Sequence, residues 1–231
     1  MLYSYIYYNI KCVIVQEEFV RIYLKRITFQ EADMIIRIPY NRQYAVEYAK
    51  KWALSRNPLF VDFTGGGGNC TNFVSQCIFA GSGIMDFTPT FGWYYRSVDD
   101  RAPAWSGVEQ LYDFLTGSGD FAGRESVGPF AIEARNRAQV ELGDVVQLAN
   151  TEGDFYHTLL ITGFNGNEIL VSANSDNALD RPLSSYPFVS LRVLHIMGVE
   201  IDVPLEESAE AIYNAEGIFA VAVGLEDVTG A

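Results

Sequence analysis

One cysteine of this chain lies where its thiol could act as a nucleophile. Residues 65–76 read Gly-Gly-Gly-Gly-Asn-Cys-Thr-Asn-Phe-Val-Ser-Gln, so Cys70 stands where a glycine-rich loop turns into a predicted helix. The first turn of a helix has unpaired backbone N–H groups and the positive end of the helix dipole, which favour a thiolate. The glycines leave room for a substrate backbone to approach. Cys70 is therefore the candidate nucleophile.

A nucleophilic cysteine needs a base within hydrogen-bond reach, and the chain offers two histidines. His157 lies at the start of an apolar run, residues 156–164, and a second apolar run follows at residues 167–173. The Asn-Gly pair at residues 165–166 between these runs indicates a β-hairpin with a two-residue turn. His195, within a later apolar run, is interpreted as structural. His157 is the candidate base.

The position of the turn decides which residue faces His157 across the hairpin. A two-residue turn at 165–166 places Asn174 opposite His157, whereas a turn at 166–167 places Asp176 there. Directly opposed residues share a face of the sheet, with Cβ atoms about 4.5–5.5 Å apart. Asn174 is therefore the predicted third residue of the site, and Asp176 is the alternative.

These residue types together predict hydrolysis of an amide bond. Cys70 would attack the carbonyl, His157 would pair with the thiolate and then protonate the leaving amine, and Asn174 would hold the imidazole. The backbone N–H of Cys70, with Asn69 and Gly68 beside it, would stabilise the oxyanion. Water would then hydrolyse the thioester.

Other residues were weighed for the same site. Trp93 and Trp105 lie in an aromatic stretch that could line a substrate groove, and packing in the core is the alternative. Cys77 reads as a small buried hydrophobic residue of the helix. No Gly-x-Ser-x-Gly pattern accompanies the serines near the cysteine, which gives a serine hydrolase little support.

The composition is that of a folded, acidic protein. The chain has 231 residues, of which 49% are hydrophobic, and a net charge of −13, so it fits one large domain with or without extensions. Such acidity argues against nucleic acid and anionic membrane surfaces as partners. Three cysteines and two histidines without zinc-ligand spacing predict neither a disulfide framework nor a metal site, and no cofactor is implied.

The first fifteen residues are apolar but lack the basic start and cleavage site of a signal peptide, and they are too short and polar for a membrane span. The chain as given is therefore expected in the cytoplasm, although a different upstream start would allow secretion. The sequence does not predict an oligomeric state.

Helical patterns come before strand patterns along the chain. Asn41 and Asn69 are the expected caps of two helices, and Ser106 with Glu109 forms the expected capping box of a third. This order predicts an α+β fold in which N-terminal helices pack on a small antiparallel sheet. Helices are expected over about residues 42–56, 70–80 (closed by Gly81) and 106–115, and strands over 144–149, 156–164, 168–173 and 191–197.

Three zones divide the chain. Residues 1–38 form an N-terminal extension with a predicted helix near 16–25, and residues 39–198 form the main domain. Residues 199–231 form an acidic C-terminal extension without Lys or Arg, with a predicted strand near 218–223.

Three blocks of the main domain resemble the "Putative amidase domain" family, a bacterial group with a papain-like fold that is related to the NlpC-type and CHAP cysteine peptidases. The blocks are Gly-Gly-Asn-Cys-Thr-Asn-Phe-Val-Ser-Gln at 67–76, Leu-Gly-Asp-Val-Val at 142–146 and His-Thr-Leu-Leu-Ile-Thr-Gly at 157–163. The resemblance covers roughly residues 39–198. It implies a papain-like, NlpC-type α+β fold, a nucleophile at Cys70 and a base at His157.

Two positions depart from the family pattern. Asn69 stands where the family usually has Asp, and Asn174 stands where a third-residue histidine is expected. The resemblance implies a cysteine amidase or peptidase whose substrate is a cell-wall peptide, a small peptide or an acyl amide. An acyltransferase that uses the same thioester is one alternative. A catalytically silent binding module on the same scaffold is another, suggested by the two departures.

Overall fold

The computed structural model of the chain describes residues 33–124 and 126–204. Cys12, the helix expected near residues 16–25 and the strand expected near 218–223 lie outside the described residues. The chain divides into two compact units, and the larger one, Ile36–Ile201, contains all the candidate site residues. Of the smaller unit, only the first residues of one strand and the last residues of another are described.

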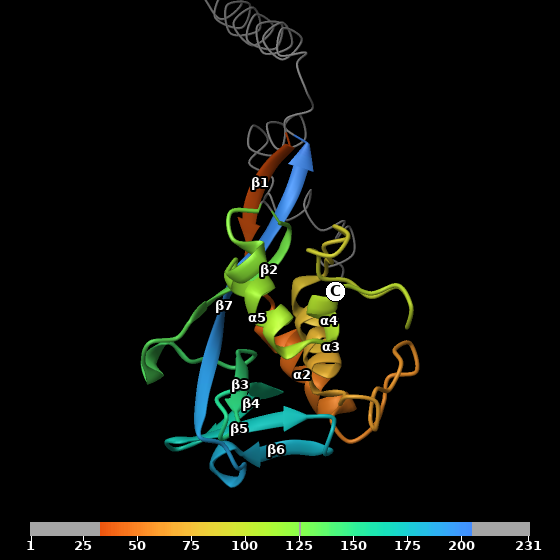
Figure 1. Cartoon of the computed structure of the whole chain (residues 1–231). Helices are drawn as coiled ribbons and strands as arrows, with labels where there is room; N and C mark the ends of the chain where they lie inside the picture. Colours follow the sequence, from red (N-terminus) through yellow and green to blue (C-terminus); the bar gives the residue numbers. More distant parts are fainter. Residues whose placement is uncertain (1–32, 125, 205–231) are drawn as a thin grey trace, which may run out of the picture. The chain divides into compact units, whose positions relative to one another are not determined.

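The predicted α+β class is confirmed. The helices α2 to α5 precede every strand except β1, and Figure 1 shows them gathered beside the sheet. The helices are α2 (Arg42–Trp52), α3 (Cys70–Ser82), α4 (Pro103–Ser106) and α5 (Val108–Thr116), with short 3-10 turns η1 (Gly119–Phe121), η2 (Arg137–Gln139) and η3 (Leu183–Ser185). The strands are β1 (Asp33–Ile38), β2 (Gly128–Glu133), β3 (Val145–Ala149), β4 (Phe155–Asn165), β5 (Glu168–Ala173), β6 (Ala178–Pro182) and β7 (Ser190–Pro204).

Within the described residues, the seven strands form one sheet in the order β1-β7-β3-β4-β5-β6, with β2 also paired to β7. The pairs β2–β7, β3–β7, β3–β4, β4–β5 and β5–β6 are all antiparallel. The four predicted strands correspond to β3, β4, β5 and β7. Sequence patterns did not indicate β1, β2 or β6.

The helix ends correct several expectations. Asn41 caps α2, because its side chain accepts a hydrogen bond from Tyr44 N at 3.0 Å, but the helix stops at Trp52 instead of continuing to residue 56. Asn69 occupies the N-cap position of α3 without making a side-chain capping bond. The helix runs past Gly81, its expected end, to Ser82.

The expected capping box at the start of α5 is wrong. Gly107 is the N-cap of this helix, and no side chain caps it. Ser106 accepts a hydrogen bond from Arg101 instead, at 3.2 Å, and Glu109 forms an ion pair with Arg192 at 2.9 Å. Both side chains are therefore committed to tertiary contacts.

The β4–β5 hairpin adopts the later of the two turns considered. Asn165 pairs with Glu168, so the central residues of the turn are Gly166 and Asn167, and the register expected from a turn at 165–166 is wrong. Gly166 has a φ of 58°, as the first central position of a type II′ turn requires. A bulge between Ile161 and Gly163 then moves the pairing back by one residue, part of the way toward the predicted register.

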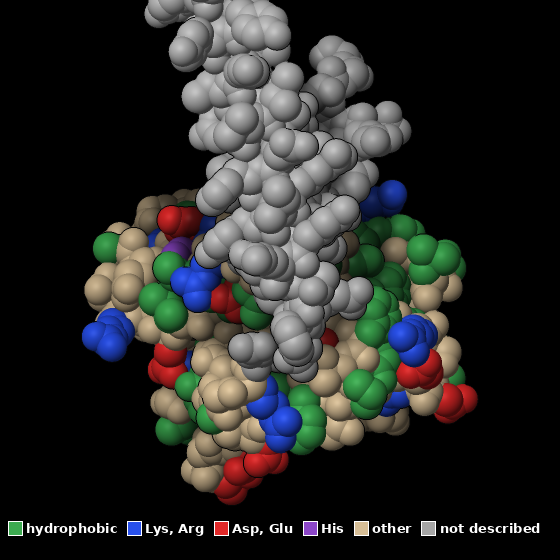
Figure 2. All heavy atoms as spheres, turned by 90° about the horizontal axis from the view of Figure 1, so that it is seen from above, with side chains coloured by type: hydrophobic (Ala, Val, Ile, Leu, Met, Phe, Trp, Pro, Cys, Tyr) green, Lys and Arg blue, Asp and Glu red, His purple; other side chains and the backbone are tan. Residues whose placement is uncertain are grey.

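Alternating side chains of the central strands form an apolar core on one face of the sheet. Core residues of β3, β4 and β5 pack there against Leu183 and Tyr186 from the segment that includes η3. The cluster comprises Val146, Leu148, Leu159, Ile161, Val171, Ala173, Ala178, Leu183, Tyr186 and Val193. On the outer surface, Figure 2 shows basic side chains interspersed with acidic and apolar ones.

A buried carboxylate anchors α2 to the sheet. Asp144 is fully buried, and its side chain receives a hydrogen bond from Arg42 Nη1 at 2.6 Å and lies 2.9 Å from His195 Nδ1. It also accepts from the backbone N–H groups of Ile196 and Glu141. The contact of His195, on β7, with Asp144, which immediately precedes β3, is therefore a structural one. Arg42 is the link between the helix and this carboxylate.

Removal of the Asp144 carboxylate should destabilise the fold. Asp144→Ala leaves the donors around it buried without a partner, so the free energy of unfolding should fall by about 3–5 kcal/mol. Asp100→Ala removes a carboxylate from an exposed ion pair with Arg96 and should change that free energy by about 0.5 kcal/mol or less. Urea denaturation followed by circular dichroism measures both, and equal midpoints for the two variants would contradict the anchor.

Candidate active site

Cys70 is the first residue of α3 and is 7% exposed. The glycine-rich loop before it needs its glycines for backbone reasons, since Gly65, Gly67 and Gly68 all have positive φ angles. Gly68 has a φ of 99°, which residues with a Cβ atom rarely adopt. The glycine run therefore sets the path by which the chain enters the helix at the cysteine.

The structure brings the side chains of Cys70 and His157 together. Burial raises the pKa of the Cys70 thiol, but hydrogen bonding to His157 and the charge of that imidazole lower it. The backbone N–H of Thr158 and the hydroxyl of Thr71, whose oxygen lies 3.8 Å from the sulfur, act in the same direction. The net result is a pKa lowered from 9.0 to about 7. A large fraction of the thiol is then ionised at neutral pH.

His157 lies on β4, opposite Leu148 of β3. Its ring stacks near Tyr156, with centroids 5.9 Å apart, and lies 5.8 Å from the ring of Tyr186. Among the described residues, no hydrogen bond joins the imidazole to a third polar side chain. The two tyrosine rings, rather than an amide, are the side chains that flank the histidine.

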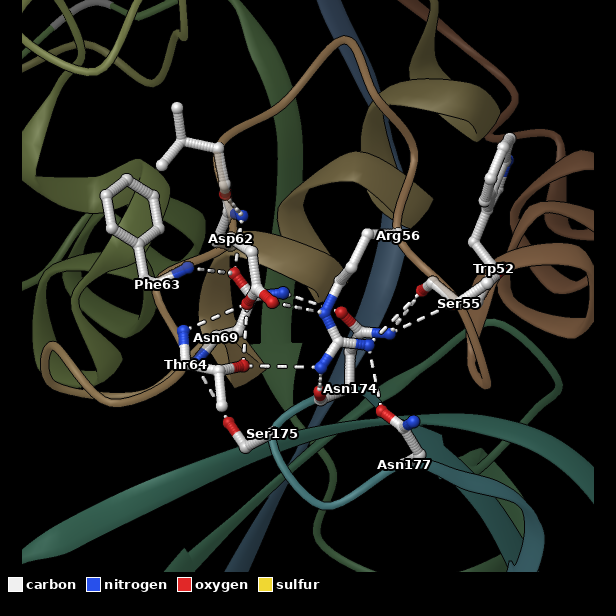
Figure 3. A network of polar contacts seen from close by, with 12 residues as sticks. Trp52, Ser55, Arg56, Asp62, Phe63, Thr64, Asn69, Asn174, Ser175 and Asn177 are labelled. Carbon is white, nitrogen blue, oxygen red and sulfur yellow. Dashed lines mark hydrogen bonds and ion pairs between the residues drawn. The ribbon is translucent and has the colours of Figure 1, made fainter.

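Asn174 does not take the place that the hairpin register predicted. Its Nδ2 donates to the carbonyls of Trp52 at 2.9 Å, Ala53 at 3.2 Å and Ser55 at 2.9 Å. Its Oδ1 accepts from Asn69 Nδ2 at 2.6 Å. Figure 3 shows this side chain directed at the end of α2. The later turn accounts for part of the difference, because the bulge in β4 cancels only half of its shift in register. In addition, β5 ends at Ala173, so Asn174 is in the turn that follows the strand and is not paired with β4.

Asn69 also differs from its expected role. It is 1% exposed, and its Oδ1 accepts from Phe63 N at 3.1 Å and from Asn72 Nδ2 at 2.8 Å. Its Nδ2 donates to Asn174 at 2.6 Å, so both ends of the amide make contacts within the fold. The backbone N–H of Asn69 donates to Ser175 Oγ at 2.9 Å. Asn69 therefore fixes the chain immediately before the cysteine.

Arg56 completes this polar network, and sequence reasoning missed it (Figure 3). Its guanidinium donates to Asn174 O at 2.6 Å and Asn177 Oδ1 at 2.8 Å. On the other side it contacts Thr64 Oγ1 at 3.2 Å and pairs with Asp62 at 3.0 Å. Arg56 thus ties the loop before the glycines to the β5–β6 turn. In the sequence, the only indication of this network was the presence of Arg56 and Asp62 on either side of a short loop.

Asp176, the alternative third residue, is exposed in the turn between β5 and β6. Burial raises the pKa of the Tyr186 phenol, the charge and hydrogen bond of Arg181 lower it, and the charge of Asp176 raises it. Asp176 therefore acts on a tyrosine that contacts His157.

The two tryptophans are core residues and do not line a groove. Trp93 and Trp105 are both fully buried, with ring centroids 5.0 Å apart. Trp93 Nε1 donates to Ser75 Oγ at 3.0 Å, and Trp105 Nε1 donates to Asn72 Oδ1 at 2.8 Å. They pack against α3 and hold its polar side chains, which was the alternative interpretation.

Neither a metal nor a membrane segment is indicated in residues 33–124 and 126–204. In these ranges, no group of three or more His, Cys, Asp or Glu side chains could hold a metal ion. None of the helices described is long and apolar enough to span a bilayer.

Comparisons with known proteins identify the family of this chain. A family model described as "Putative amidase domain" matches residues 39–196. The chain belongs to this family. The amidase-family region contains both Cys70 and His157, together with the network around Asn69.

A relative of this amidase-family chain is "Uncharacterized protein YhbB" of Bacillus subtilis (strain 168), which is 31% identical over 141 residues. The match covers 59% of this chain and 42% of the relative, so the chain spans less than half of the relative's length. No solved structure matches the chain.

The lowered pKa predicts selective labelling of one cysteine. The rate of alkylation of Cys70 by iodoacetamide should rise with pH through a midpoint near 7, because the thiolate is the reactive form. His157→Ala should raise the midpoint, since the imidazole no longer offsets the effect of burial. Mass spectrometry of labelled peptides measures each cysteine separately.

Cys77 is the internal control for this measurement. It lies on the same helix, and burial raises the pKa of its thiol well above the ordinary value. It should stay unlabelled throughout the range. A midpoint near 9 for Cys70 in the unmodified sequence would show that His157 does not activate it.

Proposed function

We propose that the domain is a cysteine-dependent amide-bond hydrolase, with Cys70 as nucleophile and His157 as base and acid. The observation that carries the proposal is the close approach of the two side chains, which lowers the pKa of the thiol to about 7 despite its burial. Membership of a family described as an amidase supports the same class of reaction. The domain boundaries that we propose are residues 39–198.

The reaction would proceed through a thioester. The thiolate of Cys70 attacks the amide carbonyl carbon, a C–S bond forms, and the carbonyl oxygen becomes an oxyanion. The C–N bond then breaks, and the imidazolium of His157 gives its proton to the leaving amine. Water adds to the thioester while His157 takes a proton from it, and the thiolate leaves with the carboxylic acid as product.

The start of α3 would stabilise the oxyanion. The first N–H groups of a helix have no partner within it, and the N–H of Cys70 is one of them. These groups and the helix dipole would stabilise negative charge beside the sulfur. The amide of Asn69 holds the loop through its contacts within the fold.

We further propose that the fold is papain-like and related to the NlpC-type peptidases. A nucleophile at the start of a helix and a base on an adjacent antiparallel sheet support this view. The resemblance favours a cell-wall peptide, a small peptide or an acyl amide as substrate. The same thioester would serve an acyltransferase, in which an amine replaces water.

Cys70→Ala should abolish turnover while the fold stays intact. Incubation with p-nitrophenyl acetate should leave an acetyl group on Cys70, detected by intact mass, and Cys70→Ala should show no such adduct. Hydrolysis of any active member of a panel of peptide amides should fall by about a thousandfold or more in this variant. Cys77→Ala is the matched control and should keep both activities.

The alternatives give different results in the same assays. Transfer products that appear when amines are added would indicate an acyltransferase. An amide turned over equally well by Cys70→Ala would refute the proposed nucleophile. A Cys70 that titrates near 9 and forms no adduct would favour a binding module.

A further inference from the structure

A row of buried polar side chains crosses the sheet on the face opposite the apolar cluster. The strand register places Gln147 of β3 directly opposite Arg192 of β7 on one side and Thr158 of β4 on the other. Gln147 and Thr158 are fully buried, and Arg192 is 8% exposed. Burying polar groups is unfavourable unless they are hydrogen-bonded, so their arrangement in one row needs an explanation.

The orientation of the Gln147 amide is fixed from two sides. Arg192 Nε lies 2.7 Å from Gln147 Oε1, and a guanidinium can only donate. The carbonyl of Val108 lies 2.8 Å from Gln147 Nε2, and a carbonyl can only accept. The amide nitrogen therefore faces Thr158, whose Oγ1 is 3.5 Å away.

The direction of the remaining hydrogen bonds follows from the charge of an ionised sulfur, which can only accept. Thr71 Oγ1 lies 3.8 Å from the sulfur and donates to the thiolate. A threonine hydroxyl has a single hydrogen, so Thr71 accepts from Thr158 Oγ1 at 2.9 Å, and Thr158 in turn accepts from Gln147 Nε2. With the thiolate, these three hydrogen bonds therefore all run toward the sulfur.

The far end of the row is held rigidly. The guanidinium of Arg192 lies between two aromatic rings, 3.6 Å from the centroid of Tyr112 and 3.8 Å from that of Phe155. Its Nη2 also pairs with Glu109 of α5 at 2.9 Å. Such packing keeps the Nε–H of Arg192 directed at Gln147 Oε1 and so prevents the Gln147 amide from rotating by 180°.

We propose that Arg192, Gln147, Thr158 and Thr71 are positioning residues whose directed hydrogen bonds present a hydroxyl donor to the sulfur of Cys70 and stabilise its ionised form. The inference rests on the proposed function, in which Cys70 is the nucleophile. This row of side chains acts in addition to His157, the titratable side chain that faces the sulfur from β4. α3 itself contains no Asp, Glu, Lys or Arg.

The test is the pH dependence of Cys70 alkylation in the full chain. Thr71→Val and Thr158→Val each remove one hydroxyl and keep the shape of the side chain. We expect the midpoint to rise by about one pH unit, so that labelling near pH 6 slows about tenfold. Thr158→Ser keeps the hydroxyl, so its alkylation midpoint should equal that of the wild type. Gln147→Met removes the amide at a distance from the sulfur and should also raise the midpoint.

Thr162→Val is the matched control. Thr162 is a buried threonine of the same strand whose hydroxyl bonds to Ser172 at 2.9 Å, outside the row. This variant loses a buried hydrogen bond but should keep the wild-type midpoint. Thermal unfolding verifies that each variant is folded, and Thr158→Val with Thr158→Ser decides the matter if Gln147→Met does not fold.

The outcomes separate this inference from the proposed function. If the wild-type midpoint lies near 7 and is unchanged in Thr158→Val, the proposed role of the row is refuted, but Cys70 remains the proposed nucleophile. A shift of equal size in Thr162→Val and Thr158→Val also refutes the role of the row, because it would reflect a general loss of packing. A wild-type midpoint near 9 refutes the proposed function itself.

Discussion

The site at the start of α3 depends on keeping the sulfur of Cys70 both buried and ionisable. Burial alone does the opposite, as the second cysteine of α3 shows: Cys77, fully buried, has a pKa well above the ordinary value. Cys70, on the same helix and 7% exposed, has its pKa lowered to about 7. Hydrogen-bond donors make the difference, because they replace the water that a thiolate would otherwise need. Those donors come from the imidazole of His157, the backbone of Thr158 and the hydroxyl of Thr71. Two of the three belong to β4, so the ionisation of the sulfur depends on how α3 docks on the sheet.

Several polar contacts fix that docking. Arg42 reaches from α2 to the buried carboxylate of Asp144, next to the start of β3. Arg56 ties the loop before the glycines to the β5–β6 turn, and Asn69, the residue before Cys70, is bonded to the same turn. The contacts of Arg42 with Asp144, Arg56 with Asn174 and Asn69 with Ser175 join residues 102, 118 and 106 positions apart in the sequence. The apolar core determines that the helices cover the sheet, whereas these directional bonds determine where the first residue of α3 lies. A displacement of one ångström there would separate the sulfur from its donors.

Local patterns were sufficient to predict four strands and to select the cysteine and the histidine whose side chains interact, because each depends on a few neighbouring residues. A glycine run before a helix start identifies Cys70, and an Asn-Gly pair identifies the hairpin that contains His157. The third residue was not predictable in this way. Gly166 occupies the first position of a type II′ turn instead of the second position of a type I′ turn, and a bulge reverses only part of the resulting shift. Because β5 also ends at Ala173, extrapolation from the turn placed Asn174 wrongly. The polar row at Gln147 was hidden for a related reason, since its meaning depends on which residues lie opposite in β4 and β7. Long-range register is decided by the whole sheet and not by one hairpin.

The two departures from the family pattern form a single matched pair. The Nδ2 group of Asn174 meets three backbone carbonyls, which only accept, so its Oδ1 must face the other way and needs a donor. Asn69 supplies that donor from its own Nδ2, while its Oδ1 accepts from Phe63 N and from Asn72. Each amide oxygen of the pair thus has a donor, and the chain before Cys70 is held in place. The two asparagines that look like separate losses in the sequence are therefore one contact between the glycine-rich loop and the β5–β6 turn.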